Sequence, residues 1–473
     1  KILWIWYNKN ICILLNKRKK IMPVIKQKKA MNPTKLITLS FLLVIVTGAV
    51  LLMLPISSRS RTFTNPIDAL FTATSATCVT GLNVFDTYTQ WTLFGQIVIL
   101  LLLQIGGLGL VTFTSFFTFA TGKKVGLRTM QTASESVNSS GFSDVRQLVR
   151  SVMIISAVCE GIGALLLMIY FVPKYGWEGV FMAIFHAVSA FTNGGFDLMG
   201  IESPGTSLAC VADNPLVMTV IMLLIISGGL GFVVWTDIKN YPKTKKLGLQ
   251  SRIVLIMTAV LIVTGAMIFA VVEWHNPDTI GNDGFFRKLV HSLFQSVTFR
   301  PAGFSTVNTA KLEPLTQIAA VFYMFIGVAP GSTGGGIKIT TFTIIVATVI
   351  SVVKNQPDTV ILGRRISKDL VYKSLSIIVL SALIICVTSL IFVNIGREYD
   401  ISGTDAVFES VSAFSTCGLS AGVTNIPNPF TRLLLCLTMF IGRVGPVSFA
   451  ITLTMGADKR PKNEVIPEGK IMV

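Results

Sequence analysis

Long apolar stretches separated by polar segments dominate the chain. A helix needs roughly 20 apolar residues to cross a hydrocarbon core about 30 Å thick. Eight stretches reach that length, at residues 36–55, 93–120, 149–172, 215–236, 252–273, 315–350, 374–395 and 431–455. The sixth is interrupted near its middle by VAPGSTGGGIK (328–338). The pattern predicts an all-α integral membrane protein with eight transmembrane helices.

The composition excludes an ordinary soluble enzyme. Of the 473 residues, 52% are apolar and only 13% are charged, whereas soluble domains carry roughly 25% charged residues. The net charge is +17, and most of the 40 Lys and Arg residues fall in segments 1–35, 122–150, 237–252, 354–373 and 456–473. These segments share one side of the membrane if the eight helices alternate. The positive-inside rule therefore places them, and both termini, in the cytoplasm, and we expect no nucleic-acid partner.

The N-terminal segment 1–35 is predicted to be a cytoplasmic basic arm. It lacks an initiator Met, and Met22 and Met31 are candidate translation starts. The seven cysteines are far apart and form no CxxC pair. We therefore expect free thiols and no structural metal.

Four segments between the predicted helices share one pattern. In each, a polar start leads into a short apolar run that ends at a glycine and a following apolar residue: NPIDALFTATSATCVTGLNV (65–84), WEGVFMAIFHAVSAFTNGGFDL (177–198), FFRKLVHSLFQSVTFRPAGFST (285–306) and GTDAVFESVSAFSTCGLSAG (403–422). Three copies carry Ser six residues before the common glycine, at Ser75, Ser189 and Ser412, whereas the third has Val297. An internal repeat determines the architecture of a chain. We expect four helix–short helix–glycine loop–helix repeats at 36–121, 149–236, 252–350 and 370–455, with a cytoplasmic tail at 456–473.

Glycine loops in this setting suggest ion binding. A dehydrated cation needs oxygens in place of its water, and rings of backbone carbonyls supply them without adding formal charge. Glycine accepts the backbone conformations that such loops require. The candidate ion-binding residues are Val79, Thr80, Gly81 and Leu82; Asn193, Gly194, Gly195 and Phe196; Pro301, Ala302, Gly303 and Phe304; and Thr416, Cys417, Gly418 and Leu419. Because the loops share only one glycine, we expect one well-formed central site.

The loops TSATCVTGL, SAFTNGGFD and SAFSTCGLS resemble those of the Trk/Ktr/HKT superfamily of cation-uptake proteins, above all the membrane subunits of bacterial Ktr systems. The resemblance extends over about residues 36–455. It implies four fused M1–pore helix–M2 units around a pseudo-fourfold pore in the cell membrane. It also implies K⁺ uptake, commonly stimulated by Na⁺, by a homodimer gated by a cytoplasmic nucleotide-binding (ATP/ADP) ring, with no organic cofactor in this chain.

Two further features of the resemblance bear on the ion and the branch. Na⁺-selective plant members carry Ser in place of the first glycine of this set, whereas this chain has Gly in all four copies, which favours K⁺. Trk-type subunits begin with two additional helices, for which we see no room before residue 36. That favours the Ktr branch.

The interrupted sixth stretch is the candidate gate. Each Gly costs a helix interior roughly 1 kcal/mol and Pro about 3, so residues 327–338 are not expected to be helical. A polar loop at membrane depth requires a cavity. We expect Gly331, Ser332, Thr333, Gly334, Gly335 and Gly336 to narrow the inner vestibule below the third glycine loop, with Lys338 as a tethered positive charge. A glycine kink for helix packing is the alternative.

Arg443 lies within the eighth stretch, where an ionisable group costs at least ~2.5 kcal/mol. The family resemblance places it beside the gate, and we expect it to bond gate carbonyls and to repel cations. A pair with Glu160, or snorkelling to the inner face, is the alternative.

The remaining polar candidates are weaker. Asp86, Asp197, Glu202 and Asp213 are either cation-concentrating or ordinary loop charges. Arg300 would oppose a cation if it faced the pore, but we expect it to brace the third short helix from behind, with Glu409 or Asp405 as candidate partners. His186 and His291 are expected to have structural roles in the short helices.

Rival functions make different demands on the sequence. Another monovalent cation, Na⁺ above all, would use the same architecture. A secondary transporter of another solute would favour inverted repeats, whereas these copies all run in one orientation. An enzyme would need a catalytic constellation, and the chain has no HExxH or GxSxG motif. We therefore expect no enzymatic activity.

Overall fold

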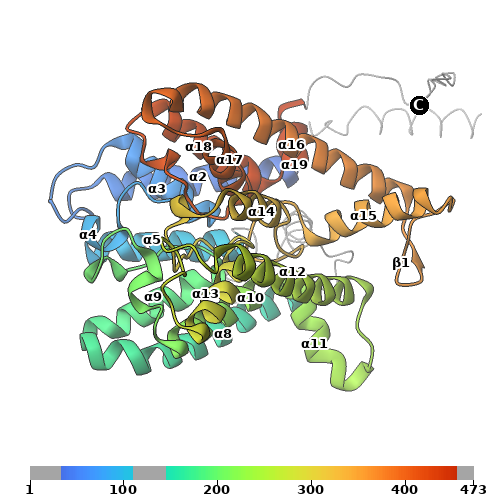
Figure 1. Ribbon diagram of the computed structural model, residues 1–473, viewed down its shortest axis with the longest axis horizontal. Coiled ribbons are helices and arrows are strands. Elements are labelled where there is room, and N and C mark those ends of the chain that lie inside the picture. The colour runs from blue at the N-terminus through green and yellow to red at the C-terminus, as the bar shows by residue number, and fades with distance from the viewer. Residues whose placement is uncertain (1–32, 110–144, 455–473) are drawn as a thin grey trace, which may run out of the picture.

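The computed structural model describes residues 33–109 and 145–454, and within these residues it is mostly helical (Figure 1). A short antiparallel hairpin of β1 (Val360–Ile361) and β2 (Arg364–Arg365) follows α15. The prediction of a helical protein is confirmed for this part of the chain. Most of the expected N-terminal arm, much of segment 122–150 and the expected tail 456–473 lie outside it.

Four helices in the described ranges are long and apolar enough to cross a membrane by themselves. They are α2 (Pro33–Met53), α8 (Val145–Tyr175), α12 (Leu249–Glu273) and α16 (Lys368–Gly396), and they coincide with the first, third, fifth and seventh predicted stretches. Large apolar side chains on all four face outward, among them Leu43, Leu165, Val271 and Leu390. An outward apolar surface of this kind suits contact with lipid rather than water.

The fourth and eighth stretches differ from the prediction because they are broken, and in the second stretch, whose residues 110–120 lie outside the described part, the helix ends earlier than predicted. Helix α5 (Leu93–Leu108) ends at Gly109, α10 (Pro215–Gly229) meets α11 (Phe232–Thr244) at a bend of 95°, and α18 (Pro429–Val444) is separated from α19 (Pro446–Thr454) by Gly445. Gly109, Gly231 and Gly445 have φ of 80°, 84° and 94°. Glycine adopts this left-handed region without steric penalty, so three of the predicted straight helices end or turn at a single glycine.

The sixth stretch is interrupted by a loop, as its glycine and proline content predicts. Helix α14 (Pro314–Phe325) ends before residues 326–338, and α15 (Ile339–Val353) begins after them. We call residues 326–338 the α14–α15 loop. The prediction that this segment is not helical is confirmed.

Four shorter helices precede the four common glycines: α3 (Pro66–Cys78), α9 (Trp177–Thr192), α13 (Phe285–Thr298) and α17 (Gly403–Ser415). Local sequence explains two of these starts, and at α3 the signal is Asn65 followed by Pro66. The Asn65 side chain accepts a bond from the Ile67 N–H at 2.9 Å, and α17 begins with a capping box between Ser402 and Asp405.

The four short helices are arranged in a ring, in which the last part of the chain packs against the first. Three of them lie between the two longer helices of their own repeat, as α9 lies between α8 and α10, whereas α13 packs mainly on α12 of its own repeat. Each also contacts a helix of the preceding segment: α9 contacts α5, α13 contacts α10, α17 contacts α14, and α3 contacts α18. Figure 1 shows the last pair, with blue α3 close to red-orange α18. This packing brings the C-terminal ends of the short helices together.

Candidate functional site

The four common glycines lie at one place in the structure. Gly81, Gly195, Gly303 and Gly418 all have left-handed φ, of 93°, 67°, 80° and 88°. A Cβ added to Gly81 would lie 2.7 Å from the Gly194 carbonyl oxygen, and one added to Gly195 would lie 2.5 Å from Gly303 Cα. At Gly303 it would lie 3.1 Å from the Cys417 oxygen, and at Gly418 it would collide with the Thr80 oxygen. The loops around these residues, which we call the first to fourth glycine loops, therefore form a closed ring.

Three of the loops leave their short helices in the same way. Val79, Asn193 and Thr416 directly follow α3, α9 and α17, and their φ values are 57°, 61° and 53°. The next N–H bonds back to the helix, from Thr80 to the Ser75 oxygen at 2.8 Å and equivalently in the other two. This is the Schellman pattern, usually built with glycine. A left-handed β-branched residue costs of order 1–3 kcal/mol and persists only where its surroundings require it.

The recurring serine anchors two of these loops. Ser75 Oγ accepts a bond from the Gly81 N–H at 3.1 Å, and Ser189 Oγ accepts one from the Phe196 N–H at 3.0 Å. Ser412 Oγ is buried without a partner. The spacing noticed in the sequence thus corresponds to a bond from helix to loop in two copies but not in the fourth.

The third loop is built differently. Helix α13 ends without a left-handed residue. Val297 stands at the serine position, and Thr298 Oγ1 donates instead to the Phe304 carbonyl at 2.5 Å. His291 Nδ1 lies 2.9 Å from Thr306 Oγ1. The third glycine loop is therefore not equivalent to the other three.

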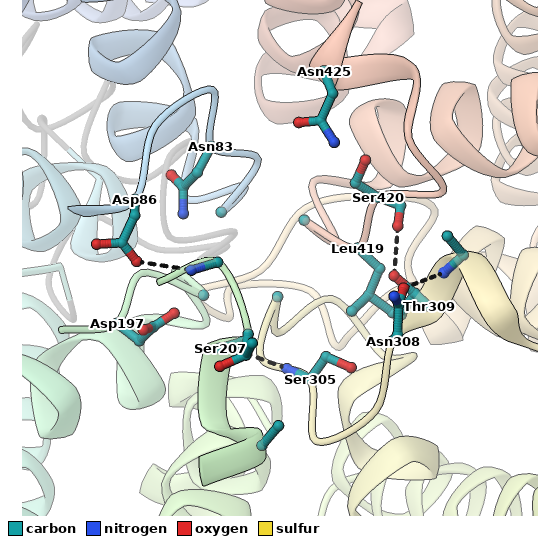
Figure 2. Close-up of a pocket in the computed structure, with 18 of the residues that line it drawn as sticks. Asn83, Asp86, Asp197, Ser207, Ser305, Asn308, Thr309, Leu419, Ser420 and Asn425 are labelled. Atoms are coloured by element: carbon teal, nitrogen blue, oxygen red, sulfur yellow. Dashed lines mark hydrogen bonds between the residues drawn. The ribbon is translucent and has the colours of Figure 1, made fainter. Parts of the chain in front are cut away.

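A cavity of about 570 Å³ lies on one side of the ring. The four common glycines line it together with polar residues, among them Asn83, Asp86, Asp197, Ser207, Ser305, Asn308, Thr309, Ser420 and Asn425 (Figure 2). Asp86 accepts a bond from the Gly205 N–H at 3.2 Å, and Asp197 accepts one from the Met199 N–H at 3.0 Å. Two carboxylates and many neutral oxygens thus surround the approach to the ring.

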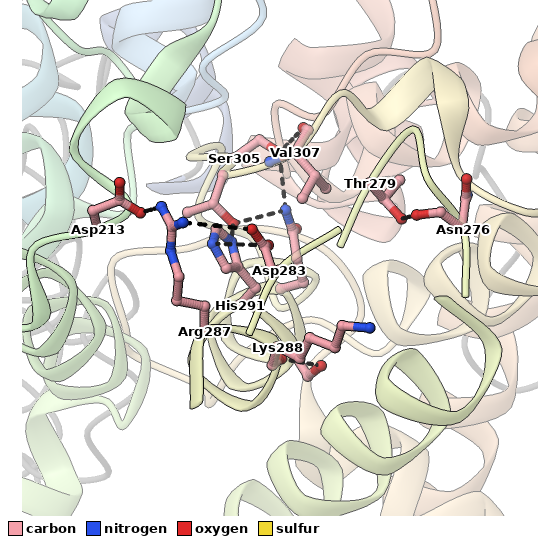
Figure 3. Close-up of polar contacts among 12 residues, drawn as sticks. Asp213, Asn276, Thr279, Asp283, Arg287, Lys288, His291, Ser305 and Val307 are labelled. Atoms are coloured by element: carbon pink, nitrogen blue, oxygen red, sulfur yellow. Dashed lines mark hydrogen bonds and ion pairs between the residues drawn. The ribbon is translucent and has the colours of Figure 1, made fainter. Parts of the chain in front are cut away.

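Glu202 and Asp213, the other two candidate carboxylates, do not line this cavity. Glu202 pairs with Lys174 at 2.5 Å and accepts a bond from Tyr175. Asp213 pairs with Arg287, which lies 3.8 Å from Asp283 (Figure 3). Both carboxylates are thus held in ion pairs outside the cavity.

The α14–α15 loop packs beneath the ring and touches several segments. The Ala329 N–H donates to the Gly229 oxygen at 3.1 Å, and Thr333 Oγ1 donates to the Phe191 oxygen at 3.1 Å. The Gly335 N–H donates to Thr416 Oγ1 at 3.1 Å. A Cβ added to Gly334 would lie 3.6 Å from the Pro301 Cβ. The loop therefore lies against the second, third and fourth glycine loops or their helices.

Arg443 links the α14–α15 loop by hydrogen bonds to the end of α5, in the first repeat. Its guanidinium donates to the Thr333 oxygen and, at 2.5 and 3.5 Å, to the oxygens of Gly106 and Gly107. The alternative pair with Glu160 is wrong for this structure, because both Glu160 oxygens accept bonds from Gln104 Nε2 at 3.1 Å.

Lys338 is held by the loop to which it belongs. Its Nζ donates to the oxygens of Gly334 and Gly335 at 2.8 and 3.4 Å. It therefore contacts the loop's own carbonyls rather than extending away from them. Gly331 and Gly336 have left-handed φ of 67° and 71°, which explains why glycine occupies these turns.

Arg300 does not pair with either suggested acid. It is 3% exposed, and its Nε has no hydrogen-bond partner in the structure. Glu409 instead bonds to residues that follow Gly418, and Asp405 caps α17 through Ser402. The suggested pairings are wrong, since neither acid is available to Arg300.

Three similar glycine-containing motifs recur along the chain, QIGGLGL (104–110), ISGGLGF (226–232) and FIGRVGP (440–446), and sequence reasoning missed why they need small residues. A Cβ on Gly106, Gly228 or Gly442 would collide with the carbonyl oxygen of Thr77, Phe191 or Phe414. Each of these carbonyls lies four residues before a common glycine. The helix that follows each of these three glycine loops thus packs directly on the end of the short helix before it, and the recurrence of the motif was the signal.

The chain was also compared with known proteins. The family described as "TrkH: Cation transport protein" matches residues 8–460. Ktr system potassium uptake protein B of Bacillus subtilis is 38% identical, over 93% of this chain and 96% of that protein. Potassium/sodium uptake protein NtpJ of Enterococcus hirae is 36% identical, over 94% and 98%. The crystal structure of the potassium transporter TrkH from Vibrio parahaemolyticus superposes with a TM-score of 0.68 at 18% identity, over 92% of this chain and 87% of that one.

Proposed function

Because this chain belongs to the TrkH family of cation transport proteins, we propose that it is the ion-translocating subunit of a Ktr-type potassium uptake system. One observation carries the proposal: four glycine loops from distant parts of the chain meet in a ring beneath a polar cavity. The family fold and its apolar helices make this a multi-pass membrane protein.

In the proposed mechanism, K⁺ exchanges its hydration water for backbone oxygens of the four glycine loops. The backbone supplies these oxygens at Val79–Leu82, Asn193–Phe196, 301–304 and 416–419. The central site lies at the four common glycines. Carbonyl dipoles suit a monovalent cation because they compensate for dehydration without trapping the ion by formal charge. Asp86 and Asp197 attract cations to the cavity above the ring.

The α14–α15 loop is the proposed gate, and residues 327–338 must move for ions to leave the ring. Arg443 holds the loop closed through Thr333 while it is itself bonded to Gly106. Its positive charge, together with that of Lys338, also opposes a cation at this point in the path. The extensive contacts of the loop with three segments support this role over a simple packing kink.

The wider assembly is proposed from the resemblance and from charge. Four M1–pore helix–M2 repeats would give eight spans in the bacterial cell membrane, with both termini cytoplasmic. The chain would form a homodimer and bind a cytoplasmic nucleotide-binding (ATP/ADP) ring. The basic segments 122–150, 237–252 and 354–373 are where that ring would dock, and Na⁺ would stimulate uptake.

A second candidate is uptake of Na⁺ or another monovalent cation through the same ring. It is favoured by one observation, the potassium/sodium uptake named for the Enterococcus relative. A secondary transporter of another solute is not favoured by any contact described above.

Growth of a K⁺-uptake-deficient cell at limiting external K⁺ tests the proposal. The wild-type chain is expected to restore growth, and more strongly with a cytoplasmic Ktr partner than without it. Gly418→Ala should abolish rescue, because its Cβ would collide with Thr80. Gly161→Ala is the matched control, since a Cβ there meets nothing within 4 Å. A wild-type chain that accumulates Na⁺ but not K⁺ would contradict the proposal in favour of the second candidate.

A further inference from the structure

Two of the glycine loops are also held beyond the ring by polar side chains of their short helices. His186 and Glu409 each lie nine residues before a common glycine. His186 Nε2 accepts a bond from the Leu198 N–H at 3.3 Å, and Glu409 Oε2 accepts one from the Ala421 N–H at 2.9 Å. Both bonds reach the third residue after the glycine. Two loops thus share an outer anchor, whose chemistry is an imidazole in one and a carboxyl in the other.

Glu409 makes the more extensive anchor. Besides Ala421, its carboxyl accepts bonds from Ser420 Oγ at 3.0 Å and from Thr424 Oγ1. The Ser420 carbonyl is held in turn by Thr309 Oγ1 at 2.5 Å, which joins the fourth loop to the segment after the third (Figure 2). The Glu409 side chain therefore holds the segment that leaves the fourth loop, residues 420–424, which we call its outgoing limb.

The burial of Glu409 explains why its carboxyl bonds so extensively to the loop. The residue is 0% exposed and has no ion pair among the described residues. A buried carboxyl without a counter-ion is unfavourable unless donors satisfy it, and here the outgoing limb of the loop provides the donors. The fourth loop lacks the anchor that the second loop has, because Ser412 Oγ is unpartnered. Among the described residues, Glu409 is thus the side chain of α17 that holds this loop from the helix.

We propose that Glu409 is a positioning residue for ion selectivity, holding the carbonyls of the fourth glycine loop at the spacing that favours K⁺ over Na⁺. The inference rests on the proposed function of the ring. Binding sites require their ligands to be held within about 0.5 Å of the productive geometry. Glu409→Gln keeps the shape but leaves one acceptor oxygen in place of two, so it cannot accept bonds from Ser420, Ala421 and Thr424 as the carboxyl does.

The test compares Glu409→Gln with Glu273→Gln. Glu273 is a matched control, because it is also 0% exposed and accepts bonds from Asn276, Thr279 and the Glu313 N–H at 2.7 to 2.9 Å. It lies at the end of α12 and contacts no glycine loop through these bonds. K⁺ uptake into proteoliposomes is measured with rising external Na⁺, and the folded fraction of each variant is measured by size-exclusion chromatography and thermal unfolding.

Glu409→Gln is expected to reduce discrimination for K⁺ over Na⁺ by up to about tenfold, the factor that corresponds to loss of one ordinary hydrogen bond. Glu273→Gln should keep the wild-type ratio. An unchanged ratio in Glu409→Gln, or an equal loss in both variants, would overturn the proposal. If Glu409→Gln does not accumulate, Thr424→Val removes one donor and leaves the carboxyl, and the same comparison decides. If the wild-type protein does not transport K⁺, the proposed function itself is refuted. That result needs no variant, so it is distinguishable from failure of the Glu409 proposal.

Discussion

Removal of the Arg443 guanidinium should release the gate. Arg443 donates to the Thr333 oxygen in the α14–α15 loop and to Gly106 where α5 ends. The loop can leave its position only if the Thr333 bond breaks. A hydrogen bond to a charged group contributes about 1.5–3 kcal/mol. Loss of that bond alone therefore raises the open population by roughly 10- to 150-fold, with a further increase from the lost electrostatic barrier.

The assay is K⁺ leak from proteoliposomes under conditions that keep the wild type closed. Arg443→Gln should leak K⁺ at least about tenfold faster than the wild type. The leak rate of Arg443→Lys should lie between those of the wild type and Arg443→Gln, because a single ammonium cannot bond to both carbonyls as the planar guanidinium does. Arg432→Gln is the matched control. It lies on the same helix, α18, and pairs with Asp68 rather than with the loop.

Arg432→Gln should lower thermal stability, because it leaves a buried carboxyl unpaired, without raising the leak of the folded fraction. A folded Arg443→Gln protein with wild-type leak would refute the gating role. Equal leak in the Arg432 and Arg443 variants would show that loosening α18, rather than freeing the loop, is responsible.

Three further changes test the ring, the gate and the anchors. Gly81→Ser should lower discrimination for K⁺ over Na⁺ in uptake assays, because φ is 93° and the new Cβ would lie 2.7 Å from the Gly194 oxygen; unchanged selectivity would contradict a site at the glycines. Deletion of 331–336 should give faster, less regulated flux, whereas a folded but inactive product would contradict a gate. Ser75→Ala should reduce stability by about 1 kcal/mol, the worth of an ordinary hydrogen bond, while Ser412→Ala should be close to neutral, and chemical denaturation of the purified proteins distinguishes the two; equal effects would refute the anchoring by Ser75.

The sequence predicted the four glycine loops well, because the pattern that carries them is local. A polar start, a short apolar run and a glycine such as Gly195 are contiguous, and their recurrence gives the register. The interruption of the sixth stretch at 327–338 was equally predictable from the sequence, since several glycines and a proline together exclude a helix.

The breaks at Gly109, Gly231 and Gly445 were not predicted. A single glycine costs a helix only about 1 kcal/mol, so sequence alone does not distinguish a tolerated glycine from a turn. The distinguishing feature is the left-handed φ that each adopts, which depends on packing against distant segments.

Side-chain partners between distant segments were the least predictable feature. Arg443 contacts the loop, as expected from the resemblance, but Arg300 has neither of its suggested partners. Glu409 was considered only as a partner for Arg300, whereas the structure directs it to Ser420 and Ala421. Spacing along the chain cannot identify which of several buried polar groups meet after folding.

The most direct measurement of the central claim is the position of a bound ion in a crystal of the purified protein grown with Rb⁺, an anomalous scatterer that substitutes for K⁺. The account predicts a peak on the axis of the ring, enclosed by carbonyl oxygens of the loops at Gly81, Gly195, Gly303 and Gly418. A peak elsewhere in the molecule, with none among these four loops, would contradict it.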